Sequence, residues 1–504
     1  LRLQNTAYSV NIKERLDFSC ALFDAEGNLI ANAPHMPVHL GSMSESIKTV
    51  IRENAGRMRA GDAYVINDPY HGGTHLPDVT VITPVFDRAG GEILFYVGSR
   101  GHHADIGGST PGSMPPFSTS LDEEGVRFIN FRLVEGQGAG RPGRLREAEL
   151  LQVLTSGAYP ARNPAQNLAD LRAQIAANEK GREELLKMVE HFTLDVVRAY
   201  MKHVQDNAEE SVRRVVTRLK DGDFEYRLDN GAVIKVRITV HRERRGATID
   251  FTGTSPQLQN NFNAPSAVCV AAVLYVFRTL VDDDIPLNAG CLKPLEIVIP
   301  EGSMLNPRYP SAVVAGNVET SSCITNALYG ALGVMASSQG TMNNFTFGNA
   351  RHQYYETISG GSGAGVEGVG ADADVRGFDG TDVVQTHMTN SRLTDPEVLE
   401  FRYPVRLDSY EIRPGSGGAG RWHGGCGGTR RVRFLEAMTA SILANNRAIA
   451  PFGMAGGQPG EAGRNWVERA DGRIEEMGHI GSVEVNPGDV CVIQTPGGGG
   501  YGAE

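Results

Sequence analysis

The sequence predicts an α/β (mixed α+β) fold of several domains, with mixed sheets, glycine-rich loops and a central helical segment. Three observations support this prediction. Short apolar runs of strand length, bounded by turn residues, recur in the first and last thirds of the chain. An apolar periodicity of three and four residues, typical of amphipathic helices, fills residues 163–220. The 504 residues are enough for two to four domains of about 100–200 residues each.

Residues 1–160 are predicted to form an N-terminal α/β region that carries a metal site. The run FSCALFD, the turn DAEGN and the run LIA are typical of a hairpin. Three further runs, at residues 63–68, 79–86 and 92–99, have the composition of strands. Residues 42–57 have the apolar spacing of a helix.

Residues 161–222 are predicted to form the helical segment. Asn163-Pro164 is a start signal for a helix, and Asp221-Gly222 is a stop signal. The segment is too long for one ordinary helix. We therefore predict two helices with a break near Gly181.

The rest of the chain is predicted to contain two regions. Residues 223–300 form a β-meander plus a helix, with a hairpin turn at Asp229-Asn230-Gly231. Residues 301–504 form a C-terminal glycine-rich α+β region, helical around residues 323–336. About half of the 61 glycines lie after residue 350 without a fixed period, and we interpret them as tight turns.

Composition excludes several classes of protein. The net charge of −11 argues against a broad basic surface for nucleic acid. The six cysteines form no CxxC pair and are interpreted as small buried hydrophobes in a reducing compartment. No run approaches the ~18–20 apolar residues of a membrane span, and no signal peptide is visible. We expect a cytoplasmic protein that binds no membrane.

Histidines and acids gather in two glycine-bounded loops of the first region. Six of the 13 histidines lie within the first 103 residues, namely His35, His39, His71, His75, His102 and His103. The loop NDPYHGGTHLPD also contains Asp68 and Asp78, and the loop GSRGHHADIGG contains Asp105. The two strands between the loops can pair antiparallel, which would bring both loops to the same end of a sheet.

Imidazole and carboxylate are the usual ligands of zinc, manganese and ferrous iron in catalytic sites. Such a metal lowers the pKa of a bound water to about 7, so the cluster predicts hydrolysis by a metal-activated water. The alternative is that these side chains only satisfy backbone groups, because a single HxxxH is a weak signal and HEXXH is absent. Burying so many polar groups without a purpose would be costly, which favours function.

Two glycine-rich runs are weaker candidates for a binding site. GGSGAG at 360–365 and PGGGGYG at 496–502 could cradle phosphate or could form tight turns. Neither matches the P-loop pattern, no GxGxxG opens a strand–helix unit, and no GxSxG is present.

Many segments in order resemble the hydantoinase B/oxoprolinase family over nearly the whole chain. They include TAYSVNIKERLDFSCALFD, NDPYHGGTHLPDVTV, GHHADIGG, GNVETSS, QGTMNNFTFG, HMTNSRLTDPEVLE and RPGSGGAGRWHGGCGG. The resemblance implies the B subunit of a two-component, ATP-dependent cyclic amide hydrolase. Its implied partner is a hydantoinase A-type subunit, which uses ATP to phosphorylate the carbonyl oxygen of a hydantoin, N-methylhydantoin, 5-oxoproline or lactam ring. The B subunit would hydrolyse the activated ring, in a hetero-oligomer such as a dimer of heterodimers.

The resemblance also implies roles for individual residues. The ligands of a divalent metal (Zn, Mn or Fe) would be Asp17, His75, Asp78 and His102. His103 and Asp105 would act as catalytic acid–base groups beside the metal, and His39 and His71 would line the substrate pocket.

Two other functions remain open. The family includes ketone carboxylases of the acetone type, whose large subunits are longer than this chain, so hydrolysis is favoured over carboxylation. The second alternative is a non-catalytic scaffold for the A subunit.

Overall fold

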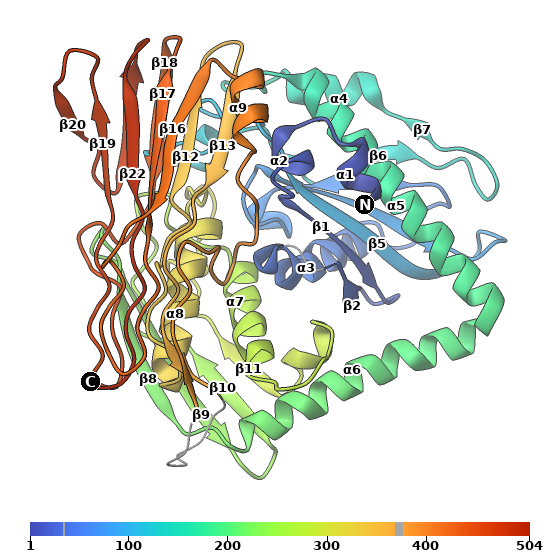
Figure 1. The fold of residues 1–504 in the computed structure, drawn as a ribbon. Helices are drawn as coiled ribbons and strands as arrows, with labels where there is room; N and C mark the ends of the chain where they lie inside the picture. Colours follow the sequence, from blue (N-terminus) through green and yellow to red (C-terminus); the bar gives the residue numbers. More distant parts are fainter. Residues whose placement is uncertain (34–35, 368–375) are drawn as a thin grey trace.

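The structure is a computed structural model that describes residues 1–33, 36–367 and 376–504. His35 lies outside the described residues. Figure 1 shows a sheet with helices in the N-terminal half, a smaller sheet in the middle of the chain, and two C-terminal sheets above a band of long extended segments. The predicted mixed α/β, multi-domain fold is confirmed. Within the described part of the chain, no helix is long and apolar enough to cross a membrane.

The N-terminal sheet has the strand order β2-β1-β5-β4-β3-β6-β7. Its strands are β1 (Phe18–Phe23), β2 (Leu29–Asn32), β3 (Ala63–Ile66), β4 (Asp78–Phe86), β5 (Ile93–His102), β6 (Phe131–Glu135) and β7 (Arg144–Leu145). The predicted hairpin is confirmed as the antiparallel pair β1–β2, and the three predicted strands are β3, β4 and β5. Helix α3 (Pro37–Glu53) packs Met43, Ile47 and Val50 against this sheet. Short helices α1 (Arg2–Thr6), α2 (Val10–Lys13) and α4 (Glu147–Leu154) complete the region.

The helical segment consists of α5 (Pro164–Phe192) and α6 (Leu194–Val216). The predicted break near Gly181 is wrong, because the chain breaks at Thr193, whose φ is +71°. Gly181 instead lies inside α5, where a Cβ atom would approach Val97 to 3.4 Å. This is an ordinary van der Waals distance, so α5 tolerates a glycine at this position without a break.

The middle of the chain forms a four-stranded sheet of order β11-β10-β9-β8. Its strands are β8 (Gly222–Arg227), β9 (Val233–His241), β10 (Gly246–Asp250) and β11 (Leu295–Val298), so the predicted meander is confirmed. Helices α7 (Ser266–Thr279) and α8 (Ser321–Leu332) share one large apolar core with this sheet and with the end of α6.

Two C-terminal sheets pack face to face. One has the order β13-β12-β18-β21 and the other β16-β17-β22-β19-β20. The strands are β12 (Asn344–Gly348), β13 (Gln353–Thr357), β16 (Val405–Ile412), β17 (Gly428–Phe434), β18 (Met438–Leu443), β19 (Arg464–Glu468), β20 (Ile474–Glu476), β21 (Ile480–Val485) and β22 (Val490–Gln494). Helix α9 (Pro396–Arg402) contacts β16. The small pair β14 (Gly365–Val366) and β15 (Gly377–Phe378) lies against the segment that follows α8, where Val366 N–H donates to the Val334 carbonyl. Alternate side chains such as Phe347, Val432 and Ile442 fill the core between the sheets.

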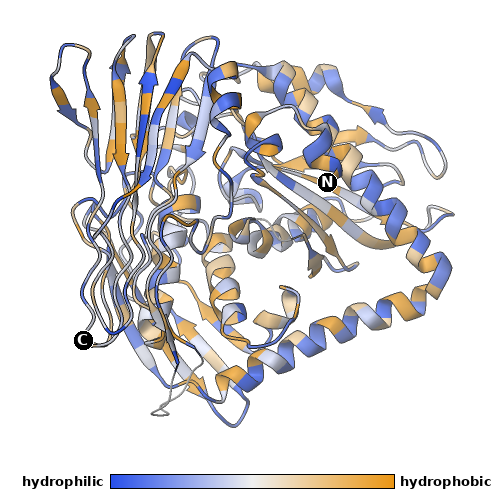
Figure 2. Ribbon diagram, viewed as in Figure 1, coloured by the Kyte–Doolittle hydropathy of each residue, from blue (hydrophilic) through white to orange (hydrophobic). Residues whose placement is uncertain are grey.

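Below these sheets, the C-terminal glycines form a lattice of extended segments, seen as the near-white band in Figure 2. We call segments 336–340, 358–364, 379–384, 416–427, 451–463 and 495–502 the glycine lattice. Successive N–H groups of one segment donate to different neighbours: Gly497 to Glu461, Gly498 to Gly425, Gly499 to Ser337 and Gly500 to Gln458. The prediction of tight turns is therefore wrong for these glycines.

The lattice also excludes the two weaker candidates for phosphate binding. The N–H groups of Gly360, Gly361, Ser362 and Ala364 donate to backbone carbonyls, as do those of 497–500. The N–H of Gly363 donates to the Ser338 hydroxyl. None of these groups remains free to hold an anion.

Candidate metal centre

The register of β4 and β5 creates the site. Asp78 and His102 are direct partners across this antiparallel pair, at the end where β4 begins and β5 ends. His75 lies three residues before Asp78 in the preceding loop. The prediction that the two loops meet at one end of the sheet is confirmed.

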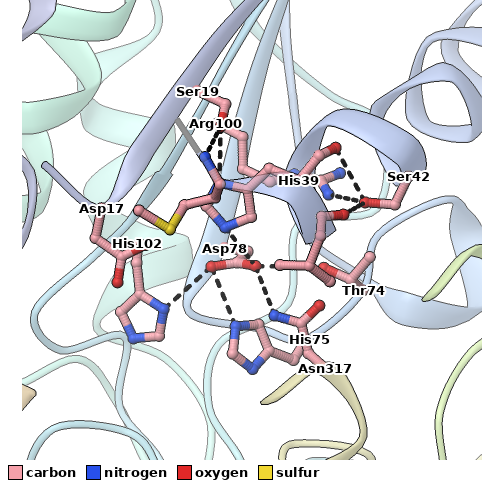
Figure 3. A network of polar contacts seen from close by, with 12 residues as sticks. Asp17, Ser19, His39, Ser42, Thr74, His75, Asp78, Arg100, His102 and Asn317 are labelled. Atoms are coloured by element: carbon pink, nitrogen blue, oxygen red, sulfur yellow. Dashed lines mark hydrogen bonds and ion pairs between the residues drawn. The ribbon is translucent and has the colours of Figure 1, made fainter. Parts of the chain in front are cut away.

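The Asp78 carboxylate is the centre of the cluster (Figure 3). Its Oδ1 lies 3.1 Å from His75 Nε2 and 3.1 Å from His102 Nδ1. Its Oδ2 lies 3.0 Å from His39 Nε2 and accepts a hydrogen bond of 3.0 Å from Asn317 Nδ2. All five side chains are buried.

The hydrogen bonds fix where two imidazole lone pairs lie. His102 Nδ1 donates to Asp78, which leaves its Nε2 as an acceptor without a hydrogen-bond partner among the described residues. His75 Nδ1 donates to the carbonyl of Val314, so its Nε2 also carries a lone pair when the ring is neutral. His75 Nε2 faces Asp78 Oδ1, yet the described part of the chain gives it no hydrogen bond.

These atoms fit a divalent cation. His75, Asp78 and His102 each offer one ligand atom, and these atoms lie within 4.8 Å of one another. Two imidazole nitrogens and a carboxylate oxygen are a donor set that zinc, manganese and ferrous iron accept. A cation between them would also satisfy His75 Nε2, a buried atom without a hydrogen-bond partner among the described residues.

Electrostatics keep the carboxylate ionised. Burial alone would raise the pKa of Asp78, but the neighbouring His39 and His75 hold it well below its usual value. Burial lowers the pKa of His102, which favours the neutral ring that a metal requires. Burial also opposes protonation of His75, but Asp78 raises the pKa of that ring above its usual value.

Asp17, the fourth predicted ligand, lies directly before β1. Its backbone carbonyl accepts from the N–H of His102 at 3.0 Å, and its carboxylate lies 3.8 Å from Arg15. Figure 3 shows the carboxylate beside the His102 ring. It is not part of the close group formed by the other three, so its role as a ligand stays a prediction.

His103 and Asp105 face away from this centre. His103 accepts from Asn167 at Nδ1 and contacts Gln174 Oε1 with Nε2, both on α5. Asp105 forms an ion pair with Arg162 at 2.9 Å and accepts from the N–H groups of its own loop. This placement favours structural roles for both residues over the predicted acid–base catalysis.

The two predicted substrate-binding histidines, His39 and His71, lie in different surroundings. His39 on α3 contacts Asp78 itself, which favours a role in holding that carboxylate. His71 is 41% exposed and pairs with Asp68 at 3.0 Å, which in turn binds Arg127. The structure thus places His71 near the surface.

The sequence prediction missed Asn317. It lies in the π-helix Gly316–Thr320, within the motif GNVETSS, which was noted for resemblance alone. π-Helical turns occur frequently at functional sites, but nothing in residue spacing marks one.

Comparison with known proteins identifies the family of the chain and similar folds. The sequence model of the family described as Hydantoinase B/oxoprolinase matches residues 1–504. A protein of Dictyostelium discoideum named 5-oxoprolinase is 44% identical over 99% of this chain, which spans 38% of that protein's length. The crystal structure of the ATP-dependent caprolactamase from Pseudomonas jessenii is similar in fold, with a TM-score of 0.84, 24% identity and coverage of 100% of this chain and 88% of that one. The nucleotide-free structure of an acetone carboxylase also has a TM-score of 0.84, with 18% identity over 99% of this chain and 73% of that one.

Proposed function

The chain belongs to the hydantoinase B/oxoprolinase family, and from this premise we propose that it hydrolyses an activated cyclic amide at the site around Asp78. The observation that carries this proposal is the buried group of His75, Asp78 and His102, in which one nitrogen of each imidazole ring lies 3.1 Å from Asp78 Oδ1. A divalent cation bound there would supply Lewis acidity and a water of lowered pKa.

The protein's own residues prepare the site. His39 and Asn317 hold Asp78, and Asp78 orients His102 so that Nε2 faces away from the carboxylate. The ring of Tyr355 stacks on His102 at 4.5 Å and excludes water from that side. Burial strengthens every charge interaction with a reacting carbonyl group.

We propose that the ATP-using step takes place outside the described residues. A cyclic amide is stabilised by resonance, and phosphorylation of its oxygen makes the carbonyl carbon a far better electrophile. The hydantoinase A-type component that performs it would lie either on a separate subunit of a hetero-oligomer or on another part of a longer chain. The second arrangement is supported by relatives named 5-oxoprolinase, of which this chain spans about two fifths.

The substrate class we propose is a small cyclic amide such as 5-oxoproline, hydantoin or a lactam. Relatives that are 44–45% identical are named 5-oxoprolinase, which places the 5-oxoproline ring first. Ketone carboxylation is the second candidate because the fold is also similar to an acetone carboxylase.

The test combines this chain with an A-type component, ATP and Zn²⁺, Mn²⁺ or Fe²⁺. We expect ring opening of 5-oxoproline, measured as free glutamate, that requires both components and ATP. Incorporation of labelled bicarbonate into a ketone would instead assign the carboxylase function. A chain that binds no stoichiometric metal, with turnover unchanged in His75→Ala, would assign a scaffold.

A further inference from the structure

The two oxygens of Asp78 have different kinds of partner. Oδ1 lies 3.1 Å from Nε2 of His75 and 3.1 Å from Nδ1 of His102, the two proposed imidazole ligands. Oδ2 faces His39 and Asn317, at 3.0 Å each, with the Thr74 hydroxyl at 3.4 Å. Oδ2 is thus engaged by donors that are not proposed metal ligands, while Oδ1 lies among the three residues that fit a cation.

His39 can donate to Oδ2 as a neutral ring. Its Nδ1 lies 3.4 Å from the Ser19 hydroxyl, which accepts from the N–H of Met36 and so has its proton available for His39. This arrangement leaves the proton of the neutral ring on Nε2, beside Asp78 Oδ2. His39 therefore has no lone pair directed at the carboxylate.

The amide of Asn317 has one chemically sensible orientation. Its Nδ2 donates to Asp78, whereas its Oδ1 has no hydrogen-bond partner among the described residues. The reversed amide would place Oδ1 against an ionised carboxylate oxygen, which is repulsive. Asp78 therefore determines the orientation of Asn317, and Asn317 in turn restrains the rotation of Asp78.

The backbone around Asn317 is held rigidly. The N–H groups of Val313 and Val314 both donate to the buried carboxylate of Glu124, at 3.0 Å. A Cβ atom at Gly316 would lie 1.9 Å from the carbonyl oxygen of Asn263, so only glycine fits there. The same segment supplies the Val314 carbonyl that accepts from His75. The backbone segment 313–317 thus orients both His75, through the Val314 carbonyl, and Asp78, through Asn317.

We propose that Asn317, together with His39, is a positioning residue that occupies Oδ2 of Asp78 and leaves Oδ1 as the single oxygen offered to a divalent cation. The inference rests on the proposed metal centre. Without Asn317 the carboxylate can rotate and bind through both oxygens, which changes the coordination number. Residues that orient a metal ligand typically contribute about 10- to 100-fold to metal affinity.

The test is Co²⁺ binding to the whole chain by calorimetry and by visible absorption. Asn317→Leu keeps the side-chain volume and removes the donor, and we expect a Kd about 10- to 100-fold weaker, with lower visible absorption as the coordination number rises. The matched control is Asn178→Leu. Asn178 is also buried and donates to Val81, on the same strand as Asp78, but it does not touch the carboxylate. Asn178→Leu is expected to lower the melting temperature and leave the Kd and spectrum of the folded protein unchanged.

His39 provides the second pair of variants. His39→Gln can place an amide N–H near the position of Nε2 and is expected to bind Co²⁺ with nearly the wild-type Kd, whereas His39→Leu is expected to bind more weakly. If His39→Gln binds as weakly as His39→Leu, His39 is a ligand rather than a positioning residue. If Asn317→Leu keeps the wild-type Kd and spectrum, the inference is overturned but the metal centre stands. If the wild-type chain binds no divalent ion, the metal centre itself is overturned.

Discussion

The His/Asp cluster and the glycine lattice are both buried and rich in hydrogen bonds, but they achieve this in opposite ways. In the cluster, side chains from distant elements converge on one carboxylate, and several polar atoms have no hydrogen-bond partner in the part of the chain that the structure describes. In the lattice, most backbone N–H groups donate to backbone carbonyls of other segments, and a few donate to side chains such as Ser338. Orphaned polar atoms therefore mark the region that can bind a ligand, while complete pairing marks the region that is scaffold.

The two regions also respond differently to substitution. Removing a side chain from the cluster takes away a chemical group and leaves the surrounding sheet intact. Adding one methyl group to the lattice forces backbone segments apart. Substitutions in the cluster should therefore lower activity, whereas substitutions in the lattice should lower stability. Four variants test this difference.

The largest effect is expected in the cluster. His102→Ala removes one of the two free Nε2 atoms and should reduce turnover about 10³-fold, because a metal ion contributes several kcal/mol of transition-state stabilisation and each 1.36 kcal/mol is tenfold in rate. Metal content by elemental analysis should fall in parallel, while the circular dichroism spectrum stays unchanged. Full activity with full metal content in His102→Ala would show that His102 is not a metal ligand.

The next effect is expected in the lattice. A Cβ atom in Gly498→Ala would lie 1.9 Å from the carbonyl oxygen of Ser362, which is backbone and cannot move aside alone. We expect a loss of about 3 kcal/mol in the free energy of unfolding, at the upper end for overpacking. Thermal unfolding measures this loss, and the metal Kd of the folded fraction should not change. A melting temperature equal to that of the wild type would show that the lattice is loosely packed.

A smaller, pH-dependent effect is expected at Glu319, which lies between the two regions on the π-helix. Burial raises the pKa of Glu319 from 4.5 to about 7, despite hydrogen bonds from Met342 and Asn344. The folded protein then holds a proton that the unfolded chain has released, so the free energy of unfolding falls as pH rises from about 4.5 to about 7.

Glu319→Gln removes that titration. The stability of the variant relative to the wild type should increase across this window, by about 3 kcal/mol in all, and stay constant above it. Melting temperatures of both proteins between pH 5 and pH 8 measure the difference. A difference that does not vary with pH would assign Glu319 an ordinary pKa.

The smallest effect is expected at a glycine outside both regions. A Cβ atom at Gly91, in the turn between β4 and β5, would meet only the Asp87 carboxylate at 3.8 Å, and its φ is not positive. Gly91→Ala should change the free energy of unfolding by less than about 0.5 kcal/mol. A loss as large as that of Gly498→Ala would mean that glycine content, rather than close packing, explains the lattice.

Local patterns in the sequence predicted the elements of the fold well. The apolar runs of β3, β4 and β5 and the helical periodicity of 163–220 depend on short-range burial, which spacing records. The helix break at Thr193 was missed because glycine is only a weak signal and tertiary packing can keep it inside a helix. The lattice was missed because interactions among several distant segments leave no period in any one of them.

The site was predicted only in part, because local patterns record strand pairing but not contacts between distant elements. Residue types and strand pairing predicted that the two loops meet, and the family resemblance selected His75, Asp78 and His102 from them. The contact between His39 and Asp78, and the whole contribution of Asn317, depend on how α3 and the π-helix pack on the sheet. Asn317 and Asp78 are 239 positions apart, and a contact over that separation leaves no trace in local spacing.

The register of β4 and β5 has a practical consequence for protein engineering. The pairing runs without a shift from Asp78–His102 to Val85–Phe95, and the irregularity falls beyond it, next to the turn at residues 87–92. An epitope tag or fluorophore inserted at this turn would be accommodated where the ladder is already irregular. The regular strand pairing between the turn and the proposed ligands would keep the spacing between Asp78 and His102 constant.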